Sequence, residues 1–161
     1  MKKMIGAAGV AAATILLSAG AVAATPPNHF EEHFEDEFDI ACDGFVLHES
    51  FTFDIHGTEH FDSSGELIRT EAHVTLEGVI TGPDGLVLSD PGHFHDTFSA
   101  EDESFRTTGL FFNIVVPGRG SVAQDTGFIE FFPDGTIVIH GPHEVFEAGG
   151  DPAPLLCPLF E

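Results

Sequence analysis

The chain has 161 residues, enough for one domain with an ordinary core, and it carries 27 Asp and Glu against 5 Lys and Arg. Its formal net charge of -22 repels nucleic acid and anionic membrane surfaces, and no cluster of Lys or Arg offers a local exception. We therefore expect no nucleic acid among its partners.

Residues 1–24 have the pattern of a secretory signal peptide. Lys2 and Lys3 precede an apolar run from Met4 to Leu17, and small residues follow up to Ala24. The run is too short to span a bilayer as a stable helix, and no later segment is long and uncharged enough to do so. We expect secretion to an extracytoplasmic space without membrane insertion, and removal of both Lys changes the formal charge from -22 to -24.

Residues 25–39 form an acidic, Phe-rich lead. Phe30, Phe34 and Phe38 lie four residues apart among six acids, a spacing that suits one face of a helix and equally one face of a strand. Phe has weak helix propensity, and like charges crowd this segment. We therefore predict an edge strand here.

Period-two alternation dominates residues 40–161, which we interpret as one β domain. The odd positions from Phe45 to Ile55 are apolar apart from Glu49, and Gly82-Pro83-Asp84-Gly85 has the composition of a hairpin turn. Only a short turn near residues 154–156 has any helical character. The sequence predicts an all-β fold, either a single antiparallel β-barrel or a two-sheet sandwich of about eight strands, whose later members are expected at residues 68–77, 86–89, 93–99, 104–116, 121–132 and 136–140.

Phenylalanine supplies every aromatic residue of the chain, 17 in all. One interpretation is that the rings fill the core, because one-sided alternation is what core packing requires. The other is that they line an apolar cavity inside a barrel wide enough to hold a small ligand.

Cys42 and Cys157 are the only cysteines, and an exported chain matures where thiols oxidise. We predict one disulfide between them, which closes the domain from its start to its end. The spacing contains no C-x-x-C pair, so a redox or metal site built from these thiols is disfavoured.

The chain contains ten histidines, and this is the one excess in its composition that suggests a chemical function, because neutral imidazole is a common ligand of transition metals. His93 and His95 lie two apart on a predicted strand and so project from one face. Asp96 projects from the other face, where it is either a bulge residue or a buried polar group that needs a partner. His140 and His143 flank a turn. If the strands are adjacent, these four histidines could bind Zn²⁺ or Cu²⁺; the alternative is that they are solvent-facing side chains with no ligand.

Catalytic motifs are weak in this chain. Residues 29–33 match the H-x-x-E-H pattern of zinc proteases, but that chemistry needs a rigid helix, and this segment is predicted to be a strand near the chain start. No G-x-S-x-G motif is present, and the carboxylates are too many for a catalytic pair to be chosen. We expect no catalytic residues.

The later half of the domain carries a resemblance. The run from Thr108 to Gly120, TGLFFNIVVPGRG, followed by Asp125-Thr126-Gly127, Asp134-Gly135 and Gly141-Pro142-His143, resembles a group of exported actinobacterial proteins of unassigned function. The resemblance implies a secreted, disulfide-closed β domain and brings no catalytic residues. A looser similarity, in size and strand number only, is to barrels of the allene-oxide-cyclase and dirigent type.

These observations favour a secreted, non-catalytic β domain with a binding or cell-envelope interaction role. One alternative is a binder of divalent metal through surface histidines and carboxylates. Another is a small-barrel isomerase or a carrier of a small apolar ligand. The sequence leaves the oligomeric state open.

Overall fold

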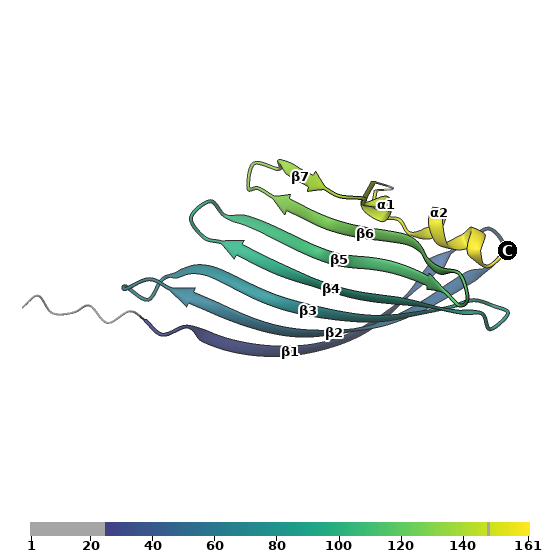
Figure 1. Ribbon diagram of the computed structural model, residues 1–161, viewed down its shortest axis with the longest axis horizontal. Helices are drawn as coiled ribbons and strands as arrows, with labels where there is room; N and C mark the ends of the chain where they lie inside the picture. Colours follow the sequence, from purple (N-terminus) through teal and green to yellow (C-terminus); the bar gives the residue numbers. More distant parts are fainter. Residues whose placement is uncertain (1–24, 148) are drawn as a thin grey trace, which may run out of the picture.

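The computed structural model describes residues 25–147 and 149–161, so the predicted signal peptide lies outside the described residues. The chain forms one seven-stranded antiparallel sheet in which every strand lies beside its neighbour in sequence (Figure 1). The strands are β1 (Asn28–Ala41), β2 (Val46–Phe61), β3 (Leu67–Thr81), β4 (Val87–Ser99), β5 (Ser104–Val116), β6 (Gly120–Phe131) and β7 (Ile137–His140).

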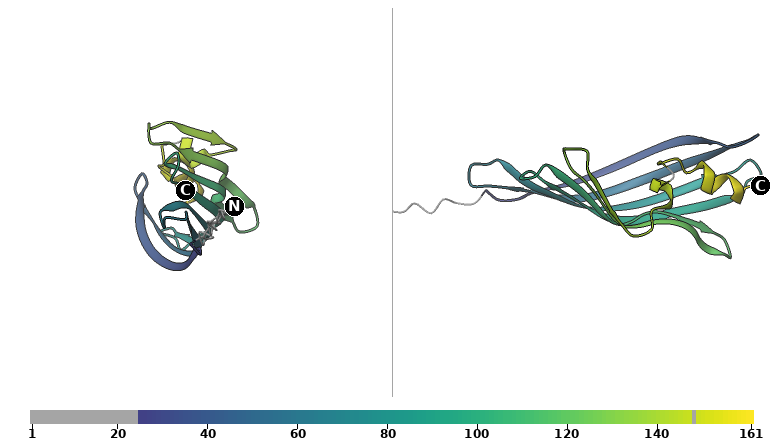
Figure 2. Two further views of the ribbon diagram at one scale, coloured as in Figure 1. Left: turned by 90° about the vertical axis from the view of Figure 1, so that its left-hand side faces the viewer. Right: turned by 90° about the horizontal axis from the view of Figure 1, so that it is seen from above.

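The sheet has an apolar inner face and a polar outer face, because side chains alternate along each strand. Cross-strand pairing places Ile40 beside Leu47 and Ile80 beside Leu88 on the inner face. These residues form a buried core with Ile114, Ala123 and Leu156. The sheet is curled, with the C-terminal segment on its inner side (Figure 2).

The C-terminal segment covers one end of the inner face. It consists of the short helices α1 (Glu144–Glu147) and α2 (Ala153–Leu156) and the 3-10 helix η1 (Cys157–Leu159). Leu156 is fully buried in the core, and the ring of Phe160 lies where a side chain at Gly82 would have to be. No helix of the described residues is long and apolar enough to cross a membrane.

Phenylalanine rings occupy the inner face beyond this cover. Phe34 stacks on Phe53, which meets Phe94 edge to face at 6.5 Å between ring centroids, and Phe94 meets Phe111 in the same way at 6.1 Å. Offset and edge-to-face pairs of this kind are favourable contacts. Phenylalanine therefore packs ring against ring inside the curl.

Two directly paired glycines lie in the second half of the sheet in backbone conformations that other residues rarely adopt. Gly109 on β5 lies opposite Gly127 on β6, and both have positive φ, at 138° and 122°. A Cβ at Gly109 would lie 2.6 Å from the carbonyl oxygen of His93, and a Cβ at Gly127 would collide with the carbonyl oxygen of His140. Only glycine fits this conformation and this close approach.

The predicted all-β antiparallel fold is confirmed, with two corrections. Residues 86–89 and 93–99 belong to one strand, β4, because Pro91 and Gly92 stay paired in unbroken register with Glu77 and Leu76 of β3, so seven strands replace the expected eight. The strands form one sheet rather than a sandwich, and β1 and β7 are its edges rather than a closed barrel seam. The α1 turn had no counterpart among the predicted elements.

The predicted disulfide is confirmed: Cys42 and Cys157 are bonded, with Cα atoms 5.6 Å apart and a sequence separation of 115. The bond ties the first hairpin to the C-terminal segment. Because so long a loop is closed, replacing both cysteines with serine should lower the free energy of unfolding by about 3 to 5 kcal/mol. Urea unfolding of the oxidised protein and the double variant measures the difference; equal midpoints would show that packing of α2 and η1 alone holds this end.

Candidate functional site

The outer face of the sheet collects nine of the ten histidines. Directly paired residues of neighbouring strands share a face, and successive residues of one strand alternate between faces. By this rule the strand register assigns each of these histidines to the outer face. They come from β1, β2, β3, β4 and β7: His29, His33, His48, His56, His60, His73, His93, His95 and His140. Only His143 lies on the inner side, where it is buried.

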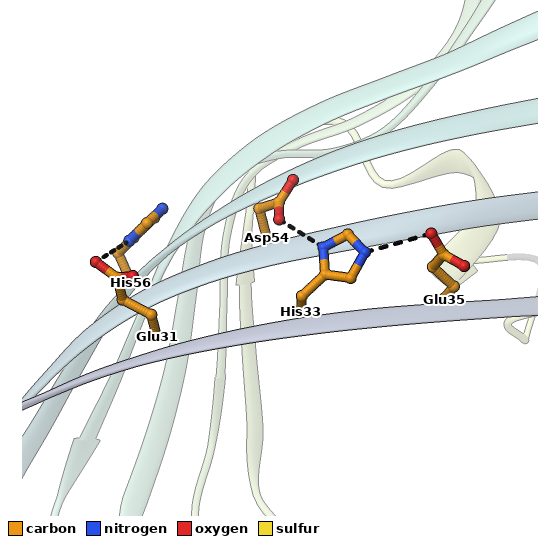
Figure 3. A network of polar contacts seen from close by, with 5 residues as sticks. All are labelled: Glu31, His33, Glu35, Asp54 and His56. Carbon is orange, nitrogen blue, oxygen red and sulfur yellow. Dashed lines mark hydrogen bonds and ion pairs between the residues drawn. The ribbon is translucent and has the colours of Figure 1, made fainter.

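His33 is held between two carboxylates at the β1–β2 pair (Figure 3). Its Nδ1 lies 2.7 Å from Asp54 Oδ1, across the strand pair, and its Nε2 lies 3.3 Å from Glu35 Oε1. Both contacts are hydrogen bonds at once only when both ring nitrogens carry protons. The hydrogen bonds to Asp54 and then to Glu35 therefore raise the pKa of His33 above its ordinary 6.5.

His48 repeats this arrangement further along the same two strands. Its Nδ1 lies 3.0 Å from Asp39 Oδ1 and its Nε2 lies 3.4 Å from Glu37 Oε2. The hydrogen bond to Asp39 is the main cause of a raised pKa at His48. His56 faces Glu31 at 3.4 Å in the same row. We call these residues of β1 and β2 the acidic histidine row: Glu31, His33, Glu35, Glu37, Asp39, His48, Asp54 and His56.

The four histidines predicted as metal ligands are not brought together. His93 and His95 share the outer face of β4, as the alternation predicts, but β5 and β6 separate them from His140 on β7. The ring of His95 instead lies 4.7 Å from that of His73. Within residues 25–147 and 149–161, no group of three or more His, Cys, Asp or Glu is arranged to hold a metal ion.

His143 lies at the turn after β7, where its contacts hold the turn against the inner side of the sheet. Its ring stacks on Phe111 at 5.2 Å between ring centroids, and its Nε2 donates to the carbonyl oxygen of His140 at 3.1 Å. The neighbouring carboxylate of Asp125 accepts the backbone N–H groups of Val145 and Phe146 at 2.9 and 3.1 Å. Asp125 thus fastens the start of α1 to β6.

Two carboxyl groups on the inner face are buried without a cationic partner. Glu49 on β2 is 5% exposed and Asp90 on β4 is 2% exposed, and they approach each other across Gly78 of β3. Asp90 accepts the backbone N–H of Asn113 at 2.6 Å, whereas no hydrogen bond to the Glu49 carboxyl is found among the described residues. Burial raises the pKa of Glu49 to about 7 and that of Asp90 to about 6.

Alternation alone places Glu49 on the inner face, but its proximity to Asp90 depends on the β2–β3–β4 register. The predicted inward position of Asp96 is confirmed: its carboxylate accepts a hydrogen bond from the Thr107 hydroxyl.

Comparison of the chain with protein-family models, with curated proteins and with solved structures finds no match.

Replacing Glu49 with glutamine should remove part of the pH dependence of stability. The folded-state pKa values of Glu49 and Asp90 lie above their ordinary values of 4.5 and 3.8, so the folded protein keeps protons that the unfolded chain has released. These groups therefore favour folding below about pH 4, and that contribution is lost as pH rises to about 7. Glu49→Gln should raise the free energy of unfolding by about 1 to 3 kcal/mol at pH 8 and leave it unchanged at pH 4.

Urea midpoints at the two pH values measure this effect. The matched control is Glu77→Gln, which neutralises an exposed acid on β3. If Glu49→Gln and Glu77→Gln have the same pH profile, the buried carboxyl is not the cause.

Proposed function

We propose that this protein is a secreted, non-catalytic binding domain that takes a cationic partner on the acidic histidine row of β1 and β2. The observation that carries the proposal is the concentration of carboxylates along one edge of the outer face, where Glu31, Glu35, Glu37 and Asp39 follow one another on β1. A one-sign field of this kind attracts and orients a partner of opposite charge. The disulfide supports a role in an oxidising, extracytoplasmic compartment.

The rest of the molecule offers this row little internal compensation. Arg69 contacts Glu71 at 3.4 Å and Arg106 contacts Glu130 at 2.7 Å, both away from β1. The ion pairs of β1 in the described chain are made by histidines alone. Above the raised pKa values of His33 and His48, these two side chains no longer offset the carboxylates of the row, which can then bind an external cation.

The alternatives have less support. Metal binding lacks a convergent set of ligands in residues 25–147 and 149–161. A carrier of a small apolar ligand needs an open apolar interior, whereas the inner phenylalanine rings contact one another. Catalysis has the buried pair Glu49 and Asp90 in its favour, but both are almost wholly shielded from solvent.

A fluorescein-labelled octalysine tests the proposed function. We expect it to bind at low ionic strength, and we expect a variant of the row, Glu31→Gln/Glu35→Gln/Glu37→Gln/Asp39→Asn, to bind about tenfold or more weakly by fluorescence anisotropy. The control removes four charges at exposed positions elsewhere: Asp84→Asn/Glu101→Gln/Glu103→Gln/Glu161→Gln. An equal loss in both variants would mean that net charge, and not the row, attracts the peptide.

Binding of octalysine should weaken as pH falls from about 8 to about 6. His33 and His48 have raised pKa values, so they gain protons in this range and cancel charge within the row, while the lysines stay charged. His33→Gln/His48→Gln should bind octalysine with a flatter pH profile. The control is His140→Gln on β7, and a double variant as pH-dependent as this control would remove these two histidines from the explanation.

A further inference from the structure

Strand β1 leaves one of its two edges unpaired. It runs for 14 residues, all in register with β2, and no strand of the described chain lies on its other side. An antiparallel strand points the N–H and C=O groups of alternate residues to opposite sides. Half of the backbone groups of β1 therefore face away from the sheet.

A hydrogen bond within β1 identifies which residues these are. The backbone N–H of Glu37 donates to the side chain of Asp36 at 2.8 Å, so it is directed away from β2. By alternation the other odd-numbered residues of β1 face the free edge as well, including Glu35 and His33. The N–H of Cys42, an even-numbered residue, donates to the carbonyl oxygen of Phe45 across the hairpin at 3.0 Å. The even-numbered residues therefore face β2, which agrees with this assignment.

We propose that β1 binds an extended cationic peptide as an additional strand of the sheet, an inference that rests on the proposed function of the acidic histidine row. The backbone of the peptide would pair with the odd-numbered residues of β1. Its side chains would then alternate between the two faces.

The side chains of β1 specify the pattern that such a peptide needs. On the outer face they present Glu31, Glu35, Glu37 and Asp39, which favour Lys or Arg in the adjacent strand. On the inner face Phe34 and Phe38 are 49% and 43% exposed and favour apolar neighbours at their own positions, which alternate with Glu32 and Asp36. The fitting partner therefore alternates basic and apolar residues.

Charge favours this partner over a second copy of the chain. β1 carries six acids, Glu31, Glu32, Glu35, Asp36, Glu37 and Asp39, and no Lys or Arg. Pairing two such strands would set these acids against one another, and like charges directly opposite are destabilising. Charged edges of this kind oppose self-association. A basic peptide reverses the sign of the interaction.

Labelled peptides of one composition and different patterns test the strand. We expect Lys-Val-Lys-Val-Lys-Val-Lys, blocked at both ends, to bind about tenfold more tightly than Lys-Lys-Val-Val-Val-Lys-Lys, because only the first matches both faces. Backbone N-methylation removes donors from one edge of the peptide. In an antiparallel pair, N-methylation of the lysines abolishes binding while N-methylation of the valines is tolerated, and a parallel pair reverses this order.

Position 35 offers a matched pair of variants. Glu35→Pro removes an outward-facing N–H that β2 does not use, and proline is tolerated on edge strands. Glu35→Gln removes the same charge and keeps the N–H. We expect Glu35→Pro to bind the alternating peptide about tenfold more weakly than Glu35→Gln, whereas the two variants bind octalysine equally. Urea unfolding of both variants verifies that the sheet is intact.

The outcomes separate the two proposals. If the alternating peptide binds both variants equally and shows no dependence on pattern, strand addition is overturned while octalysine binding upholds the acidic row. If neither octalysine nor the alternating peptide binds at low ionic strength, both the proposed function and strand addition are overturned. If sedimentation shows a dimer of the protein alone that Glu35→Pro dissociates, the edge belongs to a second copy and the peptide proposal is overturned.

Discussion

A single sheet must bury one of its faces, and this chain has little besides the sheet itself with which to do so. Strand alternation places the aliphatic residues of one end under the C-terminal segment, where Leu156 is fully buried. Beyond that cover the sheet curls, and phenylalanine rings from β1, β2, β4 and β5 pack on one another. The curl thus lets a one-layer fold bring aromatic rings into contact on its inner face, although these rings keep part of their surface in solvent, as Phe34 does at 49% exposure.

The same alternation that builds the interior sorts the titratable groups. Nine of the ten histidines and the carboxylates of the acidic histidine row go to the outer face, where hydrogen bonding raises the pKa of His33 and His48. Glu49 and Asp90 go to the inner face, where burial raises the pKa of each. Two different physical causes, hydrogen bonding to carboxylates at the histidines and loss of hydration at the acids, therefore make these four groups hold protons more strongly in the folded state than in the unfolded chain. Mild acid should suit this fold better than mild alkali.

Local features of the sequence predicted much of this arrangement. The alternation from Phe45 onward, the turn at Gly82-Pro83-Asp84-Gly85 and the pairing of the two cysteines each depend on residues close in sequence or on simple counting. The predicted strand number was wrong at Pro91-Gly92, because a proline and a glycine together are typical of a turn, whereas here both residues continue the pairing of β4 with β3.

The candidate site could not be predicted from local sequence patterns, because it depends on strand register and strand order. Alternation shows that His33 faces away from Phe34, but only the register of β1 against β2 shows that Asp54 lies opposite it. The separation of His93 from His140 likewise follows from strand order, which periodicity leaves undetermined. The free edge of β1 belongs to the same category, since it depends on which strands are neighbours.

The paired glycines at 109 and 127 form a crease that runs across β5 and β6 and ends near Gly141, whose missing side chain leaves room for the Thr126 carbonyl. At these positions the strands approach each other through backbone atoms alone, so the close contact of β5, β6 and the turn after β7 uses no side chain of the apolar interior. The close backbone contact depends on the glycines, whereas the apolar packing depends on the phenylalanine rings. An alanine at any of these three glycines would place its methyl group against the backbone of a neighbouring strand or turn, so this contact tolerates less sequence change than the phenylalanine packing around it.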